Sequence, residues 1–227
     1  MVVDKDEILR LLHTNFTTSG EISIDNEGLV SCTGGVILVT DVTHLPVRFG
    51  DVAGDFYCSS KKKLISLEGA PQVIGGDFWC DYTKLTSLAG APQKVRDFRC
   101  RNNQLLKSLE GGPVEVLGNF YCSQNPLLSS LQGAPASVGG DFWCYSHPKL
   151  RSLEGFPAVG DTLHITYKNR LPLLRTLMAK KIEFYPKNLY VWTVEQILNK
   201  YAGQGEAAAF ECGAELASEG FKENARW

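Results

Sequence analysis

The sequence predicts an α+β repeat fold: a solenoid built around a parallel sheet, capped by an N-terminal helix with strands and by C-terminal helices. Two observations predict this fold, a multi-residue motif that returns five times and a change to helical patterning near the C-terminus. A repeat of about 20–25 residues has room for one strand and a tight return, and one repeat cannot bury its own apolar side. Neighbouring repeats must therefore stack and share one continuous core.

Each repeat begins with a strand motif of the form Gly-Asp-Phe-x-Cys and continues with Leu-x-Ser-Leu and a turn such as Gly-Ala-Pro. The repeat cysteines follow one another at intervals of 22, 20, 22 and 22 residues: Cys58, Cys80, Cys100, Cys122 and Cys144. Because side chains alternate along a strand, the phenylalanine and cysteine of each motif are expected to face the core. Buried cysteines act as small hydrophobic side chains, so we expect neither disulfides nor metal ligands.

The residue between the phenylalanine and the cysteine must face outward. We call these five residues the outer column: Tyr57, Trp79, Arg99, Tyr121 and Trp143. Large aromatic side chains and arginine are preferred at the energetic centres of protein interfaces. With residues that flank the column, the predicted partner-binding set is Tyr57, Trp79, Asp81, Arg99, Arg101, Tyr121, Trp143 and Tyr145. The alternative is that the rings only stiffen the sheet as cross-strand neighbours.

The strand motif resembles a known family. Phe-x-Cys-x-x-Asn-x-Leu, at 98–105 and 120–127, is similar to the leucine-rich-repeat signature, with Phe and Cys in place of two leucines. The position of the family's asparagine ladder is irregular here and holds Lys61, Thr83, Asn103, Asn125 and His147. The longer pattern, with its Leu-x-Ser-Leu-x-Gly-Ala-Pro, resembles repeat proteins encoded by large tailed bacteriophages, and this similarity includes 45–50 and 221–227. The resemblance implies a leucine-rich-repeat-type solenoid and a phage origin rather than an activity.

The ends differ from the repeats, and we expect three segments: an N-terminal cap at 1–53, the solenoid at 54–171 and a C-terminal helical cap at 172–227. Asp4 is expected to cap a first helix, with Glu7 reaching back to the cap, and 21–53 to form strands. A last degenerate repeat runs through Leu163, Ile165 and Leu171. Helices are then expected at 172–178, from Thr193 to near Gly203, and at 205–220.

Composition narrows the classes of function. The net charge is −2, without the basic stripe that is typical of nucleic-acid binders. No apolar run reaches the roughly 18–20 residues that cross a bilayer. The first 15 residues carry Asp4, Asp6 and Glu7 and no apolar core, so we expect no secretory signal. The expected location is therefore cytoplasmic, in the host bacterial cytoplasm if the protein is phage-encoded.

No motif for catalysis is present. The repeats carry a serine column without an accompanying histidine column: Ser66, Ser87, Ser108, Ser130 and Ser152. We expect these hydroxyls to bond the backbone of the turns. The sequence holds no phosphate-binding loop, no HExxH and no GxSxG motif. It therefore predicts no enzyme, no catalytic residue, no metal and no cofactor.

These observations favour a non-catalytic interaction protein that binds a host protein through the outward strand face. A role as a phage inhibitor of host defence follows from the resemblance alone. One alternative is an enzyme or substrate adaptor that acts through the C-terminal helices, where Cys212 is the candidate nucleophile. Another is a binder of nucleic acid or a small ligand, although the aspartates beside the column oppose phosphate.

Overall fold

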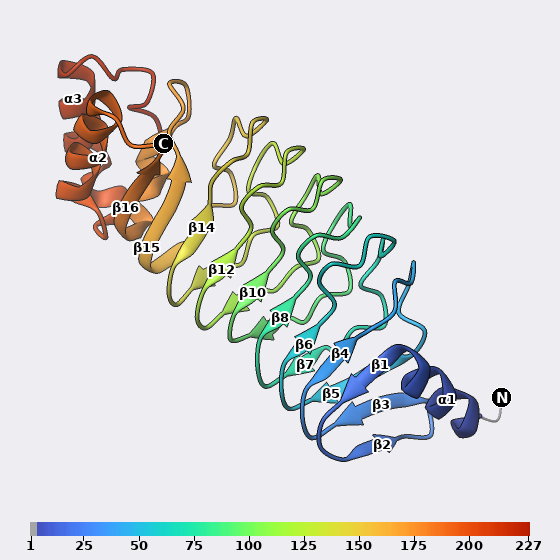
Figure 1. The fold of residues 1–227 in the computed structure, drawn as a ribbon. Helices are drawn as coiled ribbons and strands as arrows, with labels where there is room; N and C mark the ends of the chain where they lie inside the picture. Colours follow the sequence, from blue (N-terminus) through green and yellow to red (C-terminus); the bar gives the residue numbers. More distant parts are fainter. Residues whose placement is uncertain (1–3) are drawn as a thin grey trace.

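The protein is a β-solenoid of about seven turns, closed by other elements at each end (Figure 1). It is described by a computed structural model that covers residues 4–227. The predicted parallel stack is confirmed, but the expectation of one strand per repeat is wrong, because each turn holds two short strands. Two parallel sheets therefore run along the solenoid, and the long strand β15 (Ala158–Thr166) pairs with the last strand of both.

The first sheet carries the outer column. Its parallel strands before β15 are β4 (Val36–Leu38), β6 (Phe56–Tyr57), β8 (Phe78–Trp79), β10 (Phe98–Arg99), β12 (Phe120–Tyr121) and β14 (Phe142–Cys144). The second sheet consists of β3 (Leu29–Cys32), β5 (Arg48–Val52), β7 (Val73–Ile74), β9 (Lys94–Val95), β11 (Glu115–Val116) and β13 (Ser137–Val138) before it reaches β15. Most strands of the second sheet have only two residues, one exposed or half-buried and one buried. A two-residue strand is too short to show alternation in the sequence, which explains why the second sheet was not predicted.

In some turns, glycines at the corner between the two strands let successive turns approach closely. A Cβ atom on Gly75 would lie 2.2 Å from the carbonyl oxygen of Ala53, and one on Gly139 would lie 2.0 Å from that of Leu117. These contacts are with backbone atoms, which cannot move aside without separating the turns. Gly75 and Gly139 therefore have no room for a side chain, although other turns carry side chains at the same corner position, as Ala53 and Leu117 show.

The core is a set of parallel side-chain columns. Phenylalanine lies over phenylalanine in the strand register, from Phe56 to Phe142, and each of these rings is fully buried. The rings of Phe56 and Phe78 stack with centroids 5.3 Å apart and planes 5° from parallel. The repeat cysteines are also buried, and all seven cysteines of the chain are free thiols. The prediction that the phenylalanine and cysteine of each motif face the core is thus confirmed.

A short ladder of buried polar side chains ties the turns together next to the cysteines. The amide nitrogen of Asn103 donates to the carbonyls of Cys80 and Cys100, and its oxygen accepts from the backbone N–H of Thr83. Asn125 repeats the arrangement one turn later and accepts from the backbone N–H of Asn103. These bonds satisfy backbone groups that would otherwise be buried without partners.

The N-terminal segment covers the first edge of both sheets. Helix α1 (Lys5–Asn15) begins as predicted, because the Asp4 carboxylate accepts from the backbone N–H of Glu7. The side chain of Glu7 does not reach back to the cap and instead bonds Arg10. The strands that follow are antiparallel to the stack: β1 (Phe16–Thr18) pairs with β4, and β2 (Ile22–Ile24) pairs with β3.

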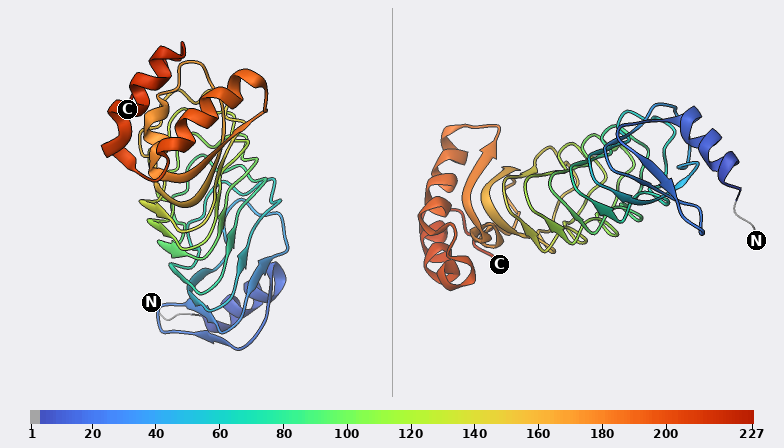
Figure 2. Two further views of the ribbon diagram at one scale, coloured as in Figure 1. Left: turned by 90° about the vertical axis from the view of Figure 1, so that its left-hand side faces the viewer. Right: turned by 90° about the horizontal axis from the view of Figure 1, so that it is seen from below.

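The C-terminal segment forms a layer across the other end of the solenoid (Figure 2). It consists of η1 (Leu173–Met178), β16 (Ala179–Tyr185), α2 (Leu189–Tyr201), η2 (Gly205–Ala208) and α3 (Ala209–Ser218). Strand β16 extends the sheet beside β15 and was not predicted. The start expected at Thr193 is wrong, because Asn188 caps α2 and the Glu195 carboxylate faces inward to accept from the backbone N–H of Phe184. Within residues 4–227, no helix combines the length and apolar character needed to cross a membrane.

Candidate functional site

The outer column is a continuous stack of rings and one guanidinium group on the first sheet. The rings of Tyr57 and Trp79 lie 5.2 Å apart. The guanidinium carbon of Arg99 lies 4.5 Å from the ring centroids of both Trp79 and Tyr121, so the cation is held between two aromatic faces. Tyr121 then stacks on Trp143 with centroids 6.1 Å apart. All five side chains are half-buried.

The stack continues beyond the predicted residues into the C-terminal segment. His164 is the register partner of Trp143 in β15, and its ring lies on the indole with centroids 3.6 Å apart. The ring of Tyr185 follows at 5.9 Å from His164 and also packs against Tyr145. The sequence reasoning missed His164 because β15 lacks the Phe-x-Cys motif. The signal was the pattern of Leu163 and Ile165 on either side, which repeats the alternation of buried and outward residues.

His164 lies among acidic groups but is held mainly neutral by its surroundings. Its Nε2 is 3.7 Å from an Asp141 carboxylate oxygen, and its Nδ1 is 3.6 Å from Glu183 and 3.3 Å from the Tyr185 hydroxyl. Burial lowers the pKa of His164 below 6.5, and the charges of Asp141 and Glu183 oppose this shift only in part. The imidazole therefore acts as an aromatic ring of the stack near neutral pH.

A row of acidic and amide side chains beside the column forms hydrogen bonds from each turn to the backbone of the next. The Asp55 carboxylate accepts from the backbone N–H of Asp77, and Asp77 accepts from that of Asp97. The same bond recurs from Asp97 to Asn119 and onward along the stack. Arg96 also forms a two-point ion pair with Asp77, which lowers the pKa of that carboxyl. The aspartates beside the column, which were expected from the sequence to oppose phosphate, are thus largely engaged in hydrogen bonds within the protein.

On the other side of the column, Asp81 and Arg101 form an ion pair. Asp81 is only 5% exposed, so its carboxylate is a buried support rather than a contact surface. It accepts from the backbone N–H of Arg101 at 2.6 Å and from its guanidinium at 3.2 Å. The guanidinium of Arg101 lies 5.6 Å from the Tyr121 ring. Apart from Asp81, the side chains of the predicted partner-binding set form one partly exposed face.

A hollow of about 650 Å³ lies at the N-terminal end of the outer column. Its walls include the rings of Tyr57 and Trp79 and the charged side chains of Asp55 and Arg96. Its floor is formed largely by the corner glycines of successive turns: Gly35, Gly54, Gly75 and Gly76. Because these residues carry no side chains, the corner leaves space directly beside the exposed ring edges.

Some buried N–H groups of the column and of the flanking Arg101 have no hydrogen-bond acceptor within residues 4–227: Nε1 of Trp79, Nε1 of Trp143, Nε of Arg99 and Nε of Arg101. Because these atoms are buried, they are not part of the surface that a partner would contact.

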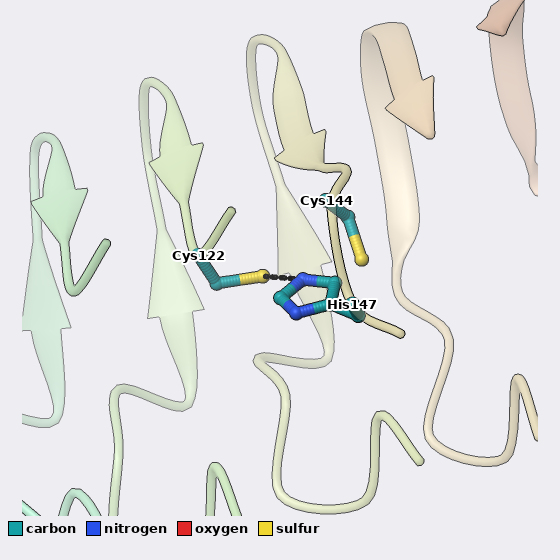
Figure 3. Close-up of side chains that lie close together, drawn as sticks. All are labelled: Cys122, Cys144 and His147. Atoms are coloured by element: carbon teal, nitrogen blue, oxygen red, sulfur yellow. Dashed lines mark hydrogen bonds between the residues drawn. The ribbon is translucent and has the colours of Figure 1, made fainter. Parts of the chain in front are cut away.

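A second cluster lies inside the solenoid, where Cys122, Cys144 and His147 converge (Figure 3). Their Sγ and imidazole nitrogen atoms all lie within 4.8 Å of one another, and all three residues are buried. His147 Nδ1 donates to the carbonyl oxygen of Asn125 at 3.0 Å, which leaves Nε2 facing the Cys122 sulfur at 3.9 Å. The sequence reasoning treated the cysteines as a linear column and His147 as an irregular ladder position, and therefore did not bring them together.

The electrostatic surroundings favour a thiolate at Cys144. A hydrogen bond from Cys122 lowers the pKa of Cys144, and the charges of His147 and Lys168 lower it further, against the opposing effect of burial. Burial is the largest effect on the pKa of His147 and lowers it, but the charge of Cys144 and the hydrogen bonds with Cys144 and Asn125 together raise it, so the net shift is upward. Lys168 is held near the cluster by the carbonyls of His147, Pro148 and Leu150.

The other residues considered for chemistry have structural roles. The hydroxyls of Ser66, Ser108 and Ser152 each accept from the backbone N–H two residues later at 3.0 Å, which confirms the predicted turn role. Cys212 is buried in α3, and burial raises its thiol pKa to about 12. A thiol protonated at neutral pH is a poor nucleophile.

Comparisons with protein-family models, with curated proteins and with solved structures give no match. The resemblance of the repeat motif to leucine-rich repeats and to phage proteins therefore depends on the quoted residues alone.

Proposed function

We propose that the protein is a non-catalytic interaction protein that binds a protein partner through the outer column and its flanking residues. The observation that carries the proposal is the unbroken stack from Tyr57 to Tyr185 on one partly exposed sheet face. Aromatic side chains and arginine are the residues that most often dominate binding energy at protein interfaces. A solvated sheet face would more often carry threonine, lysine or glutamate.

The packing of the column suits binding because the contact surface is already ordered. Arg99 is held between Trp79 and Tyr121, and Arg101 is held by Asp81. Side chains fixed in this way lose little conformational entropy when a partner docks.

The chemistry of the column indicates the kind of segment that it would accept. Aromatic faces accommodate an apolar or aromatic side chain, and guanidinium N–H groups favour a carboxylate or a backbone carbonyl. Strands lie about 4.8 Å apart, so the stack from Tyr57 to Tyr185 is about 29 Å long, which suits a helix or an extended loop of the partner. The hollow beside Tyr57 would accept one larger side chain of that segment.

We further propose that the solenoid is of the leucine-rich-repeat type, since Asn103 and Asn125 make the ladder bonds expected at that motif position. A phage origin, a host partner in the bacterial cytoplasm and a counter-defence role are proposals that depend on the resemblance of the repeat motif.

A second candidate interface is the C-terminal layer. Phe210 is 88% exposed, Leu189 is 81% exposed and Trp192 is 53% exposed, which is unusual for large apolar side chains. These residues belong to helices α2 and α3, whose other faces pack on the solenoid end. This surface would serve the adaptor function considered from the sequence.

The test is affinity capture from a bacterial lysate with the wild-type protein and with a Trp79→Ala/Trp143→Ala double variant, followed by mass spectrometry and titration of the purified partner. We expect Trp79→Ala or Arg99→Ala to weaken binding by about tenfold or more, since such residues typically contribute about 2 kcal/mol. Lys62→Ala, on an exposed loop, is the matched control and should bind normally. Normal binding by both column variants, with loss in a Leu189→Ser/Phe210→Ser variant, would overturn the proposal and assign the interface to the C-terminal layer.

A further inference from the structure

We propose that Cys122, Cys144 and His147 form a binding site for a soft, thiophilic metal ion, with Cu(I) as the preferred occupant and Zn(II) as the alternative of the same class. Two cysteine sulfurs and one imidazole nitrogen are ligands that both ions accept. This site is separate from the outer column and independent of the proposed partner binding.

The spacing of the three atoms suits metal coordination. With metal–sulfur bonds of about 2.3 Å and metal–nitrogen bonds of about 2.0 Å, neighbouring ligand atoms lie roughly 3.5–4 Å apart. The Cys122 sulfur is already 3.9 Å from His147 Nε2, and all three atoms lie within 4.8 Å of one another. A shift of under about 1 Å, within the reach of a χ1 adjustment, would complete the geometry.

The imidazole is oriented as a metal ligand requires. His147 donates from Nδ1 to the carbonyl oxygen of Asn125, so Nε2 is the ring nitrogen that faces the sulfur atoms and would exchange a proton for the metal. An outer hydrogen bond of this kind fixes both the tautomer and the ring direction of metal-bound histidines. In the two preceding turns the same position holds Asn103 and Asn125, which cannot supply this nitrogen ligand. The convergence of sulfur and nitrogen therefore occurs at one turn of the five.

The charge balance also suits a bound ion. Two thiolates with Cu(I) carry a net charge of −1, which the ammonium of Lys168 offsets from its position on the carbonyls of His147 and Leu150. Two thiolates with Zn(II) are neutral and would take a water as fourth ligand. In the part of the chain that the structure describes, the cluster contains no fourth Cys, His, Asp or Glu, which is why a three-ligand ion is preferred.

The cluster is buried but lies next to an access route. A hollow of about 320 Å³ is lined by His147, Lys168 and Tyr185, so the turn that carries the buried His147 borders a surface opening. The sulfur atoms behind it are fully or almost fully buried, which leaves no room for a substrate beside the Cys144 thiolate. A small ion is therefore a better occupant than the substrate of a nucleophilic cysteine.

The test uses the intact protein, reduced and then freed of thiol reductant, titrated separately with Cu(I) and Zn(II) against a chromogenic chelator. We expect 1:1 binding, a rise in the thermal midpoint with bound metal, and X-ray absorption that reports two sulfurs and one nitrogen. Binding of Zn(II) in place of Cu(I) would support the site and reassign its ion. Failure of both ions to bind would overturn the proposal.

Two variants locate the site. His147→Asn places the ladder amide of the preceding turns at this position, so the fold should be retained while metal affinity falls by at least a hundredfold. Cys144→Ser should act in the same way, whereas Cys58→Ser, in the same column but far from the histidine, should bind as wild type does. Addition of Asn125→His to the His147→Asn variant is expected to restore a site one turn earlier, with Cys100 and Cys122. Unchanged binding in folded His147→Asn protein would refute the site.

Discussion

The imidazole of His164 lies flat on the indole of Trp143, with ring centroids 3.6 Å apart and planes 13° from parallel. Trp143 belongs to the last repeat motif, whereas His164 belongs to β15, the strand that joins both sheets and supports β16. The contact therefore extends the outer column from the repeats into the C-terminal segment. The contact joins the regular repeats to a strand that lacks the repeat motif.

This contact should be measurable as a coupling energy. In a double-mutant cycle of Trp143→Ala and His164→Ala, we expect the two losses to differ from additivity by about 0.5–1.5 kcal/mol, as for other stacked aromatic pairs. Urea unfolding of the four proteins gives the free energies. Tyr57→Ala combined with His164→Ala is the control and should be additive, because these rings are separated by the rest of the column. Additivity in both cycles would show that the stack contributes no energy of its own.

The same histidine should give stability a pH dependence. Because burial lowers the pKa of His164 in the folded state, the unfolded chain binds its proton more readily. The free energy of unfolding is therefore highest above the pKa of His164 in the unfolded chain, about 6.5, and decreases as the pH falls through and below that value. Between about pH 7.5 and 5, wild-type protein should lose more unfolding free energy than His164→Gln. An equal or smaller loss in wild type would contradict the direction of this shift.

The phenylalanine column should carry much of the stability. Phe98 is fully buried between Phe78 and Phe120, at 5.4 and 5.8 Å between centroids. Phe98→Ala should lower the free energy of unfolding by roughly 3–5 kcal/mol, the usual range for a buried phenylalanine. Leu105→Ala is the control, because Leu105 is 42% exposed and should cost within about 0.5 kcal/mol. A loss below about 1 kcal/mol at Phe98 would mean that the ring is not part of the core.

The sequence was informative wherever a residue type recurred at a fixed interval. Phe98 and Cys100 could be placed inside, and Arg99 outside, because five copies share one alternation. The second sheet could not be predicted, since residues such as Val73 and Ile74 form strands too short to show a period. The Cys122–His147 contact was missed for another reason: it joins the column of one turn to the ladder position of the next, and only the stacking geometry shows this.

Thiol accessibility tests directly whether the repeat cysteines face the core. Cys58, Cys80, Cys100 and Cys122 are 0% exposed and Cys144 is 1% exposed, so a thiol reagent should label none of them in the native protein. Denaturation should release all seven thiols of the chain. Rapid native labelling of most repeat cysteines would place them on the open face, since a slip of one residue exchanges the two faces of a strand.

Two glycine substitutions should have opposite effects. A Cβ on Gly139 would lie 2.0 Å from the Leu117 carbonyl oxygen, so Gly139→Ala should destabilise the protein by about 1–3 kcal/mol. A Cβ on Gly213, inside α3, would meet the Leu174 side chain at 3.4 Å and the Ala225 Cβ at 4.0 Å, which are ordinary van der Waals contacts. Gly213→Ala should therefore stabilise by about 0.5–1 kcal/mol through the higher helix propensity of alanine. Thermal or urea unfolding measures both, and a neutral Gly139→Ala would show that the turns can separate at the corner.

The sheets are covered at both ends of the solenoid, and this affects how the number of repeats can change in evolution. Because β1 and β2 cover the first edges and β15 with β16 completes the other end, the turns between them are interchangeable units in one register. Loss or duplication of one unit of 22 residues would alter the length of the ring stack in a step of about 4.8 Å. Gain or loss of such units would therefore lengthen or shorten the outer column in fixed steps while the two ends stay the same.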